Sequence, residues 1–158
     1  QIGLINGICG ALAFVVGSIL GGYFISAFSL RKTLFTLCCC FNIPFVIYLL
    51  FAIYQPTSIP LIGLGVTLEW FGYGFGFVGL TLFMMQQVAP GSHKMAHYAF
   101  ASGIMNLGVL LPGAISGWIV ESVGYQSFFT IVLFAAIPAF IITWFLPFTY
   151  SEEQNTNE

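Results

Sequence analysis

The sequence predicts an all-α fold, a polytopic membrane helical bundle, and three observations support this prediction. Only eight of the 158 residues are Asp, Glu, Lys or Arg, which is 5% against about 25% in a typical soluble domain. Apolar residues make up 59% of the chain, and its mean hydropathy is +1.00. The charges leave long uncharged runs between them, and a helix needs about 20 apolar residues to cross a bilayer. This composition excludes a secreted disulfide scaffold, a nucleic-acid binder and a disordered tail.

Turn residues and charges mark the first two of five expected spans. The first covers about 3–28 and ends at the turn Ser29-Leu30-Arg31-Lys32. The second covers about 33–54 and ends where Gln55-Pro56-Thr57-Ser58 supplies turn-forming residues. Ser58 is a suitable N-cap and Pro60 fits a first helical turn, so a third helix is expected to begin near residue 59.

The remaining spans follow by the same signals. The third covers about 59–87 and stops at Ala89-Pro90-Gly91-Ser92, the fourth covers about 94–120, and a turn at 121–125 leads into the fifth at 126–146. The spans together form one predicted bundle, residues 1–148, and residues 149–158 form a polar cytoplasmic tail.

The three basic residues predict the orientation of the chain in the membrane. Arg31 and Lys32 lie between spans one and two, and Lys94 lies between spans three and four, whereas the loops at 55–58 and 121–125 have no basic residue. Lys and Arg gather in cytoplasmic loops. We therefore expect the N-terminus outside and the C-terminus in the cytoplasm.

Small residues recur at helical spacing in two spans, and this pattern predicts close helix packing. Small side chains let membrane helices approach closely, which replaces the hydrophobic driving force that lipid does not supply. In span one the pattern consists of Gly3, Gly7, Gly10, Gly17 and Gly21, and in span four of Ala99, Gly103, Asn106, Leu110, Gly113 and Gly117.

Glu69 is the most informative residue, because it lies in the middle of a predicted span. It stands ten residues after Ile59, which places it about 15 Å into a hydrocarbon core about 30 Å thick. A charged residue there costs on the order of 2.5–3.5 kcal/mol, so its presence needs a reason. Gly65, Gly72 and Tyr73 share its side of the helix, so the acid is expected to point into the bundle.

Two interpretations of Glu69 compete. In the structural one it is protonated and hydrogen-bonds a neighbouring helix. In the functional one it titrates during transport or contacts a polar substrate, with Tyr73 beside it. We favour the functional interpretation, because intramembrane acids mark substrate and proton pathways. Asn106 is a second candidate, although an interhelical hydrogen bond explains it about as well as substrate contact does.

No motif in the sequence indicates an enzyme, a cofactor or a metal site. His93 and His97 stand four residues apart, but Lys94 follows His93 where a zinc protease would have Glu, and no nearby carboxylate completes a site. The four cysteines lie in apolar runs and are expected to behave as small hydrophobic side chains. Nucleophile elbows, phosphate loops and dinucleotide fingerprints are absent from the sequence.

Several segments resemble the major facilitator superfamily. Gly17-Ser-Ile-Leu-Gly21-Gly22, followed by Ser29-Leu-Arg31-Lys32, is similar to the signature in which a glycine-rich helix end leads into a short basic loop. The resemblance implies a gating role for Gly21, Gly22, Arg31 and Lys32 in that cytoplasmic loop. Ser26 and Ala27 stand where the family usually has an acidic residue.

Two further segments look like the muropeptide permease branch of that superfamily. They are Glu69-Trp-Phe-Gly72-Tyr-Gly74 and the stretch from Gly113 to Phe129. The resemblance implies proton-coupled import of muropeptide-like sugar–peptides across a bacterial inner membrane. It also implies that the five spans correspond to helices 8–12 of a twelve-helix facilitator, so that the N-terminal half of the transporter is missing from this chain.

The expected partners are therefore the lipid bilayer, a small-molecule substrate, protons and the missing half. Two other functions remain open at this point. One is a facilitator for another small solute, such as a drug, a sugar or an acyl compound. The other is a membrane scaffold that transports nothing, in which the glycine faces serve assembly alone.

Overall fold

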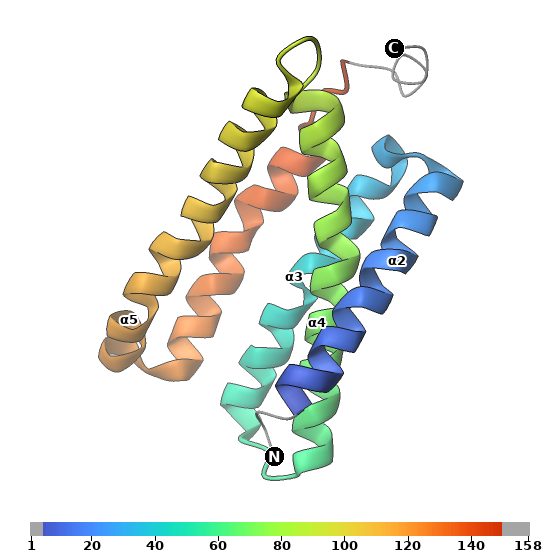
Figure 1. Cartoon of the computed structure of the whole chain (residues 1–158). Helices are drawn as coiled ribbons and strands as arrows, with labels where there is room; N and C mark the ends of the chain where they lie inside the picture. Colours follow the sequence, from blue (N-terminus) through green and yellow to red (C-terminus); the bar gives the residue numbers. More distant parts are fainter. Residues whose placement is uncertain (1–4, 150–158) are drawn as a thin grey trace.

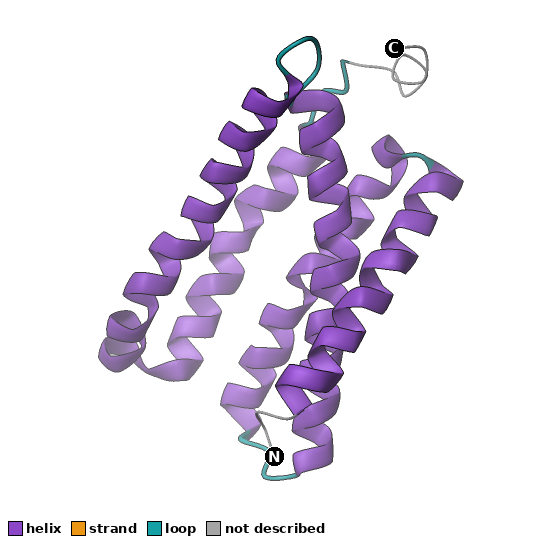
Figure 2. Cartoon of the chain, in the orientation of Figure 1, coloured by secondary structure: helices purple, strands orange, loops and turns teal. Residues whose placement is uncertain are grey.

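The computed structural model describes residues 5–149, and every regular element in that range is helical, without a strand (Figure 2). This confirms the predicted all-α fold. Four stretches are long and apolar enough to cross a membrane, namely Gly7–Phe28, Leu30–Tyr54, Ile59–Val88 and Lys94–Phe145. The elements are η1 (Ile5–Gly10), α2 (Ala11–Phe28), α3 (Leu30–Tyr54), α4 (Ile59–Phe83), η2 (Met84–Val88) and α5 (Lys94–Phe145), where η denotes a π-helical turn. Gly3 of the first glycine pattern and most of the expected tail, 150–158, lie outside the described residues.

The longest helix, α5, consists of two antiparallel arms that meet at Gly124 (Figure 1). A straight helix of its 52 residues would extend about 78 Å, more than twice the thickness of a bilayer core. Gly124 breaks the helix with φ 77° and ψ 163°, a conformation that is essentially restricted to glycine. We call residues 94–123 the first arm and residues 125–145 the second arm.

The connection between α2 and α3 is shorter than the sequence predicts. Ser29 alone separates the two helices, and it adopts φ 67° and ψ 149°. Both the backbone N–H and the side-chain hydroxyl of Thr33 donate to the carbonyl oxygen of Ser29, at 3.3 and 2.9 Å. These bonds allow α3 to begin at Leu30. Arg31 and Lys32 therefore lie in the first turn of a helix and not in a loop, where both are exposed.

The helix α4 packs against both α2 and α3, and glycines bring its backbone close to each (Figure 1). On the α2 side, a Cβ on Gly21 would lie 2.6 Å from the carbonyl oxygen of Phe75, and a Cβ on Gly17 would overlap the carbonyl oxygen of Phe71. Gly74 of α4 likewise faces the carbonyl oxygen of Phe14. The first of the two predicted glycine faces is thus a tight helix contact at Gly10, Gly17 and Gly21, whereas a Cβ on Gly7 would meet nothing within 4 Å among the described residues.

On the α3 side, the closest approach lies beside a proline. Pro44 has no N–H to donate to the carbonyl of Cys40, one helical turn earlier. That carbonyl oxygen lies 2.6 Å from the position of a Cβ on Gly72, and the carbonyl oxygen of Leu37 lies equally close to one on Gly76. The freed carbonyl therefore faces a bare backbone in α4.

The second predicted glycine face, on the first arm of α5, is open. A Cβ built on Gly103, Gly113 or Gly117 would meet nothing within 4 Å among the described residues. Ala136, in the second arm, is the one buried residue of α5. Tight packing therefore occurs on the first predicted face and, within residues 5–149, not on the second.

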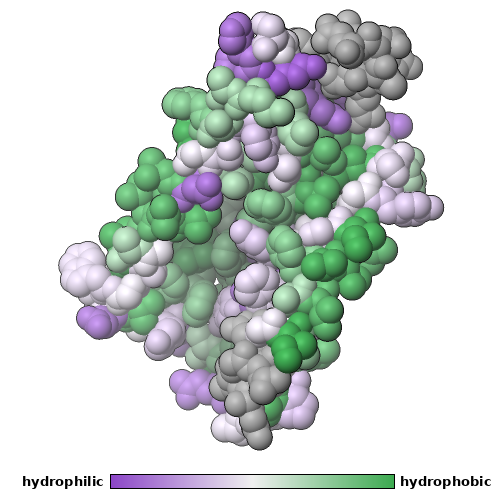
Figure 3. All heavy atoms as spheres, in the orientation of Figure 1, coloured by the Kyte–Doolittle hydropathy of each residue, from purple (hydrophilic) through white to green (hydrophobic). Residues whose placement is uncertain are grey.

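The second arm is held against α3 by aromatic rings. Phe35 of α3 makes edge contacts with Phe140 and Trp144, with ring centroids 6.3 and 5.2 Å apart. On the face that Figure 3 shows, apolar side chains cover much of the flank and strongly hydrophilic ones lie mostly towards the two ends. This distribution fits a bundle that crosses a bilayer lengthwise.

Candidate functional site

Glu69 lies in α4 and is bound by a residue that the sequence analysis did not single out. The hydroxyl of Tyr48, in α3, donates a hydrogen bond to Oε2 of Glu69. Both side chains are partly buried between the two helices. They belong to consecutive antiparallel helices joined by the loop at 55–58, and each lies within about three turns of that loop. Tyr48 lies about 9 Å from the end of α3 and Glu69 about 15 Å from the start of α4. Their proximity within one helical hairpin is the signal that could have indicated Tyr48.

The ring of Tyr48 also contacts the second arm of α5. It stacks on Phe129 with the ring centroids 5.4 Å apart and the ring planes inclined by 15°. Phe129 itself packs edge-on against Phe128, at 5.3 Å. A single side chain thus joins the carboxyl of α4 to α3 and to the second arm of α5.

Tyr73, predicted to act beside Glu69, belongs to an aromatic cluster instead. Its ring lies 4.9 Å from that of Phe41 in α3, 5.8 Å from that of Phe14 in α2, and 5.8 Å from that of Phe77, on which it stacks. Among the described residues, the hydrogen-bond partner of Glu69 is Tyr48 and not Tyr73. Tyr73 therefore packs at the junction of α2, α3 and α4.

The structure does not bring Asn106 to Glu69. Asn106 is exposed on the first arm of α5, whereas the rings and hydroxyl around Glu69 come from α3 and the second arm. Of the residues expected to gate the cytoplasmic loop, Gly21 is buried against α4, while a Cβ on Gly22 would meet nothing within 4 Å. A gating role for Gly21, Gly22, Arg31 and Lys32 stays a prediction.

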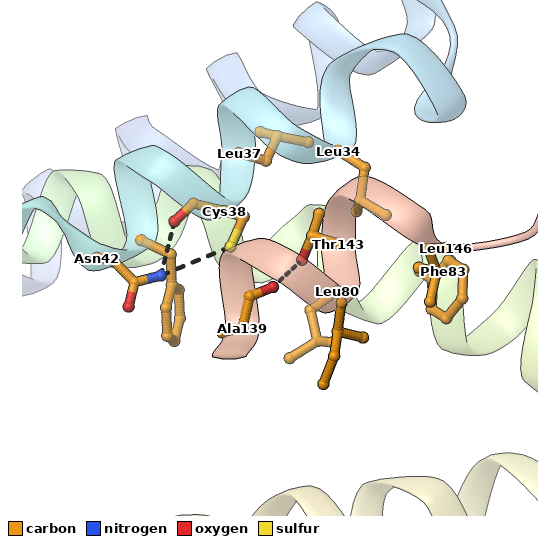
Figure 4. Close-up of a pocket in the computed structure, with 12 residues that line it drawn as sticks. Leu34, Leu37, Cys38, Asn42, Leu80, Phe83, Ala139, Thr143 and Leu146 are labelled. Atoms are coloured by element: carbon orange, nitrogen blue, oxygen red, sulfur yellow. Dashed lines mark hydrogen bonds between the residues drawn. The ribbon is translucent and has the colours of Figure 1, made fainter. Parts of the chain in front are cut away.

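A separate cavity of about 340 Å³ lies between α3, α4 and the second arm of α5 (Figure 4). Its few polar side chains are already engaged within their own helices. Asn42 donates to the carbonyl of Cys38 at 2.8 Å, and Thr143 donates to the carbonyl of Ala139 at 2.7 Å. The cavity can therefore accommodate an apolar group. It is lined by Leu34, Leu37, Cys38, Phe41, Asn42, Gly76, Leu80, Phe83, Ala139, Ile142, Thr143 and Leu146.

Within residues 5–149, no group of three or more His, Cys, Asp or Glu side chains is arranged to hold a metal ion. The rings of His93 and His97 lie 6.4 Å apart, and both residues are exposed beside the loop that precedes α5.

Comparison with known proteins gives two kinds of relative. The anhydromuropeptide permeases of Escherichia coli strains K12 and O157:H7 are each 26% identical over 144 residues, which is 90% of this chain and 28% of theirs. An uncharacterized protein of Haemophilus influenzae is 32% identical over 94 residues, which is 58% of this chain and 22% of that protein. The chain thus spans less than a third of the length of the curated relatives it matches.

The family assignment rests on the whole chain. No solved structure gives a significant match. A family model of the Major Facilitator Superfamily, by contrast, matches residues 1–158. With its apolar, membrane-length helices, this chain is a multi-pass membrane protein that belongs to the major facilitator superfamily of transporters.

Proposed function

We propose that this chain is part of a secondary active transporter that imports muropeptide-like sugar–peptides together with protons by alternating access. One observation carries the proposal: a partly buried carboxyl, Glu69, lies mid-helix in a membrane span and is bound by a hydroxyl from a neighbouring helix. Two relatives that bear the name anhydromuropeptide permease support the choice of substrate. The chain acts as a transporter segment and not as an enzyme.

Glu69 provides the proton-coupling step of this mechanism. The carboxylate takes up a proton from the outer side, moves as a neutral carboxylic acid, and releases the proton on the cytoplasmic side. Neutralisation matters because a charge is costly in hydrocarbon. In facilitators the substrate site lies near the midplane, between two halves that rock against each other.

The proposed orientation follows from the charges at the helix ends. Arg31 and Lys32 at the start of α3 and Lys94 at the start of α5 face the cytoplasm, as basic residues near span ends do. The C-terminus then also lies in the cytoplasm. The relatives come from bacteria, which supports an inner-membrane location.

The bilayer, the substrate, protons and the remaining part of the transporter are the proposed partners. The glycine face of α2 and the open face of the first arm of α5 share one spacing, which supports a missing helix partner. On η1 and α2 this face is covered by α4 at Gly10, Gly17 and Gly21 and open at Gly7, whereas its counterpart on the first arm is bare. Residues 96 positions apart correspond: Gly7 and Gly103, Gly10 and Asn106, Gly17 and Gly113, Gly21 and Gly117.

The experiment is proton-driven uptake of labelled anhydromuropeptide by the complete transporter in vesicles with an imposed pH gradient. Glu69→Gln should lower that uptake about tenfold or more while expression is retained, because the glutamine cannot carry the proton. Glu121→Gln, at the exposed turn before Gly124, is the matched control and should leave uptake within about twofold. Undiminished proton-driven uptake by Glu69→Gln would contradict the coupling role.

The chain on its own should not transport, because it holds part of a site that forms between two halves. Uptake by vesicles that contain this chain alone would show that expectation to be wrong.

A second candidate is a facilitator for an apolar solute, such as a drug-like or acyl compound. The apolar cavity between α3, α4 and the second arm of α5 favours it. Competition separates the two candidates: uptake of a labelled acyl compound that unlabelled muropeptide does not inhibit would favour this second function.

A further inference from the structure

We propose that Tyr48 is a positioning residue of the proton site, which links the protonation state of Glu69 to the packing of the second arm of α5. The inference rests on the proposed proton-coupling role of Glu69 and deepens it. It starts from two contacts of different kinds made by one side chain. The Tyr48 hydroxyl donates to Glu69 in α4, and the Tyr48 ring stacks on Phe129 in the second arm.

The two contacts of Tyr48 are mechanically coupled. The phenol is a rigid plane, so its oxygen and its ring move together when the side chain rotates. The hydroxyl oxygen lies on the axis about which the ring turns, so the hydrogen bond to Glu69 fixes the direction of that axis and hence where the ring lies against Phe129. The observed inclination of 15° between the rings belongs to the state in which the hydroxyl binds Glu69.

Few other ionisable groups lie on the elements around Glu69. Arg31 and Lys32, the cations of α3, are in its first turn, about 24 Å along the helix from Tyr48. The other ionisable residues nearby are the thiols Cys38, Cys39 and Cys40 and Tyr54 in α3, Tyr73 in α4, Tyr23 in α2, Tyr125 at the start of the second arm, and the exposed Cys9 in η1 and Glu121 at the end of the first arm. Tyr73 is held in the aromatic cluster, and Tyr23, Tyr54 and Tyr125 are exposed. Tyr48 is thus the group that responds first to a proton on Glu69.

Protonation changes the character of the bond between Tyr48 and Glu69. The carboxylate accepts a charge-assisted hydrogen bond from the Tyr48 hydroxyl, and such bonds are about twice as strong as neutral ones. A proton that binds a Glu69 oxygen turns that oxygen into a donor, and the bond to Tyr48 becomes a neutral one. Tyr48 keeps its own proton throughout, and the transported proton enters and leaves on Glu69.

The second arm has two anchor points on α3, and they differ in what controls them. Near its end it is held by Phe35, through ring contacts with Phe140 and Trp144 that involve no ionisable group. Near its start, close to the break at Gly124, it is held through Phe129 and Tyr48. If only the contact between Tyr48 and Phe129 weakens, the second arm can pivot about its contact with Phe35, with Gly124 as the hinge.

The test uses the complete transporter in lipid vesicles, with two readouts and matched variants. The first readout is the pH dependence of uptake. The second is the distance between spin labels on exposed Leu50→Cys in α3 and exposed Ile131→Cys in the second arm, in a cysteine-free background. In the otherwise unaltered protein, this distance should differ between acidic and neutral pH.

Tyr48→Phe keeps the ring and removes the hydroxyl. It should move the pH of half-maximal uptake upward by about one unit, because the carboxylate loses its donor, and it should abolish the pH-dependent distance change. Tyr125→Phe, which removes an exposed hydroxyl, should change neither. Phe129→Leu should keep the pH of half-maximal uptake and lose the distance change, whereas Phe129→Tyr, which retains a stacking ring, should keep both.

The outcomes separate this inference from the proposed function. If Glu69→Gln retains proton-driven uptake, the proposed function is wrong and the inference falls with it. If Glu69→Gln loses coupled uptake while Tyr48→Phe keeps the original pH profile and distance change, the inference alone is overturned. A distance change that survives in Phe129→Leu overturns the part of the inference that concerns the second arm. Monodisperse elution in detergent shows that each variant is folded.

Discussion

The carbonyl oxygen of Phe75 in α4 lies 2.6 Å from the place that a Cβ on Gly21 of α2 would occupy. A methyl group there meets backbone, which cannot rotate away as a flexible side chain can. We expect Gly21→Ala to destabilise the bundle by about 1–3 kcal/mol, the usual cost of overpacking. The free energy of unfolding in a denaturing-detergent titration measures this loss.

The adjacent glycine supplies the control for that substitution. A Cβ on Gly22 would meet nothing within 4 Å in the described part of the chain. Gly22→Ala should therefore be neutral or stabilise by up to about 1 kcal/mol, because alanine loses less backbone entropy in a helix. Equal losses for both variants would show that α2 and α4 do not meet at this face.

The bare glycine face on the first arm of α5 gives a context-dependent prediction. Gly113→Leu should be neutral or stabilise this chain by up to about 1 kcal/mol, because a Cβ on Gly113 would meet nothing within 4 Å among residues 5–149 and leucine loses less backbone entropy in a helix. In the complete transporter the same change should lower the yield of folded protein and uptake, because we propose that a helix of the remaining part packs against this face. Detergent titration measures the first effect, and reconstituted uptake measures the second. Unchanged yield and uptake of the complete Gly113→Leu transporter would exclude a helix contact at Gly113.

The proposed orientation is open to a labelling test. Ser92 and Thr57 are both exposed and lie in loops at opposite ends of the bundle. In a cysteine-free background, Thr57→Cys should react with a membrane-impermeant thiol reagent added to intact cells, and Ser92→Cys should react after the cells are opened. The reverse labelling pattern would show that the chain has the opposite orientation in the membrane.

The fold was predictable because the membrane imposes simple rules on the sequence. A chain with 5% charged residues has to form apolar helices, and Pro, Gly and basic residues mark where they end. The errors concern local geometry. The predicted loop at 29–32 is the single residue Ser29, because Thr33 satisfies the Ser29 carbonyl twice and lets α3 begin early.

The site was predictable only in part, for a different physical reason. Helical depth alone singles out Glu69, since charge in hydrocarbon is costly wherever the helix packs. Its partner depends on how α3 and α4 are rotated about their axes, and Pro44 and the glycines of α4 set that rotation through backbone contacts. The sequence pattern placed Tyr73 beside Glu69 on one face, yet the Tyr73 ring turns toward Phe14 and Phe41.

The single-residue connection at Ser29 has an energetic consequence. With φ 67° and ψ 149°, the backbone of Ser29 lies near a region of φ and ψ that residues other than glycine rarely adopt. This conformation costs about 1–3 kcal/mol. The burial of Leu30, the next residue, and of Leu37, two turns further along α3, holds the chain in this form. Any movement that lets Ser29 relax recovers that energy. The link between α2 and α3 therefore stores backbone strain, which a separation of the two helices would release.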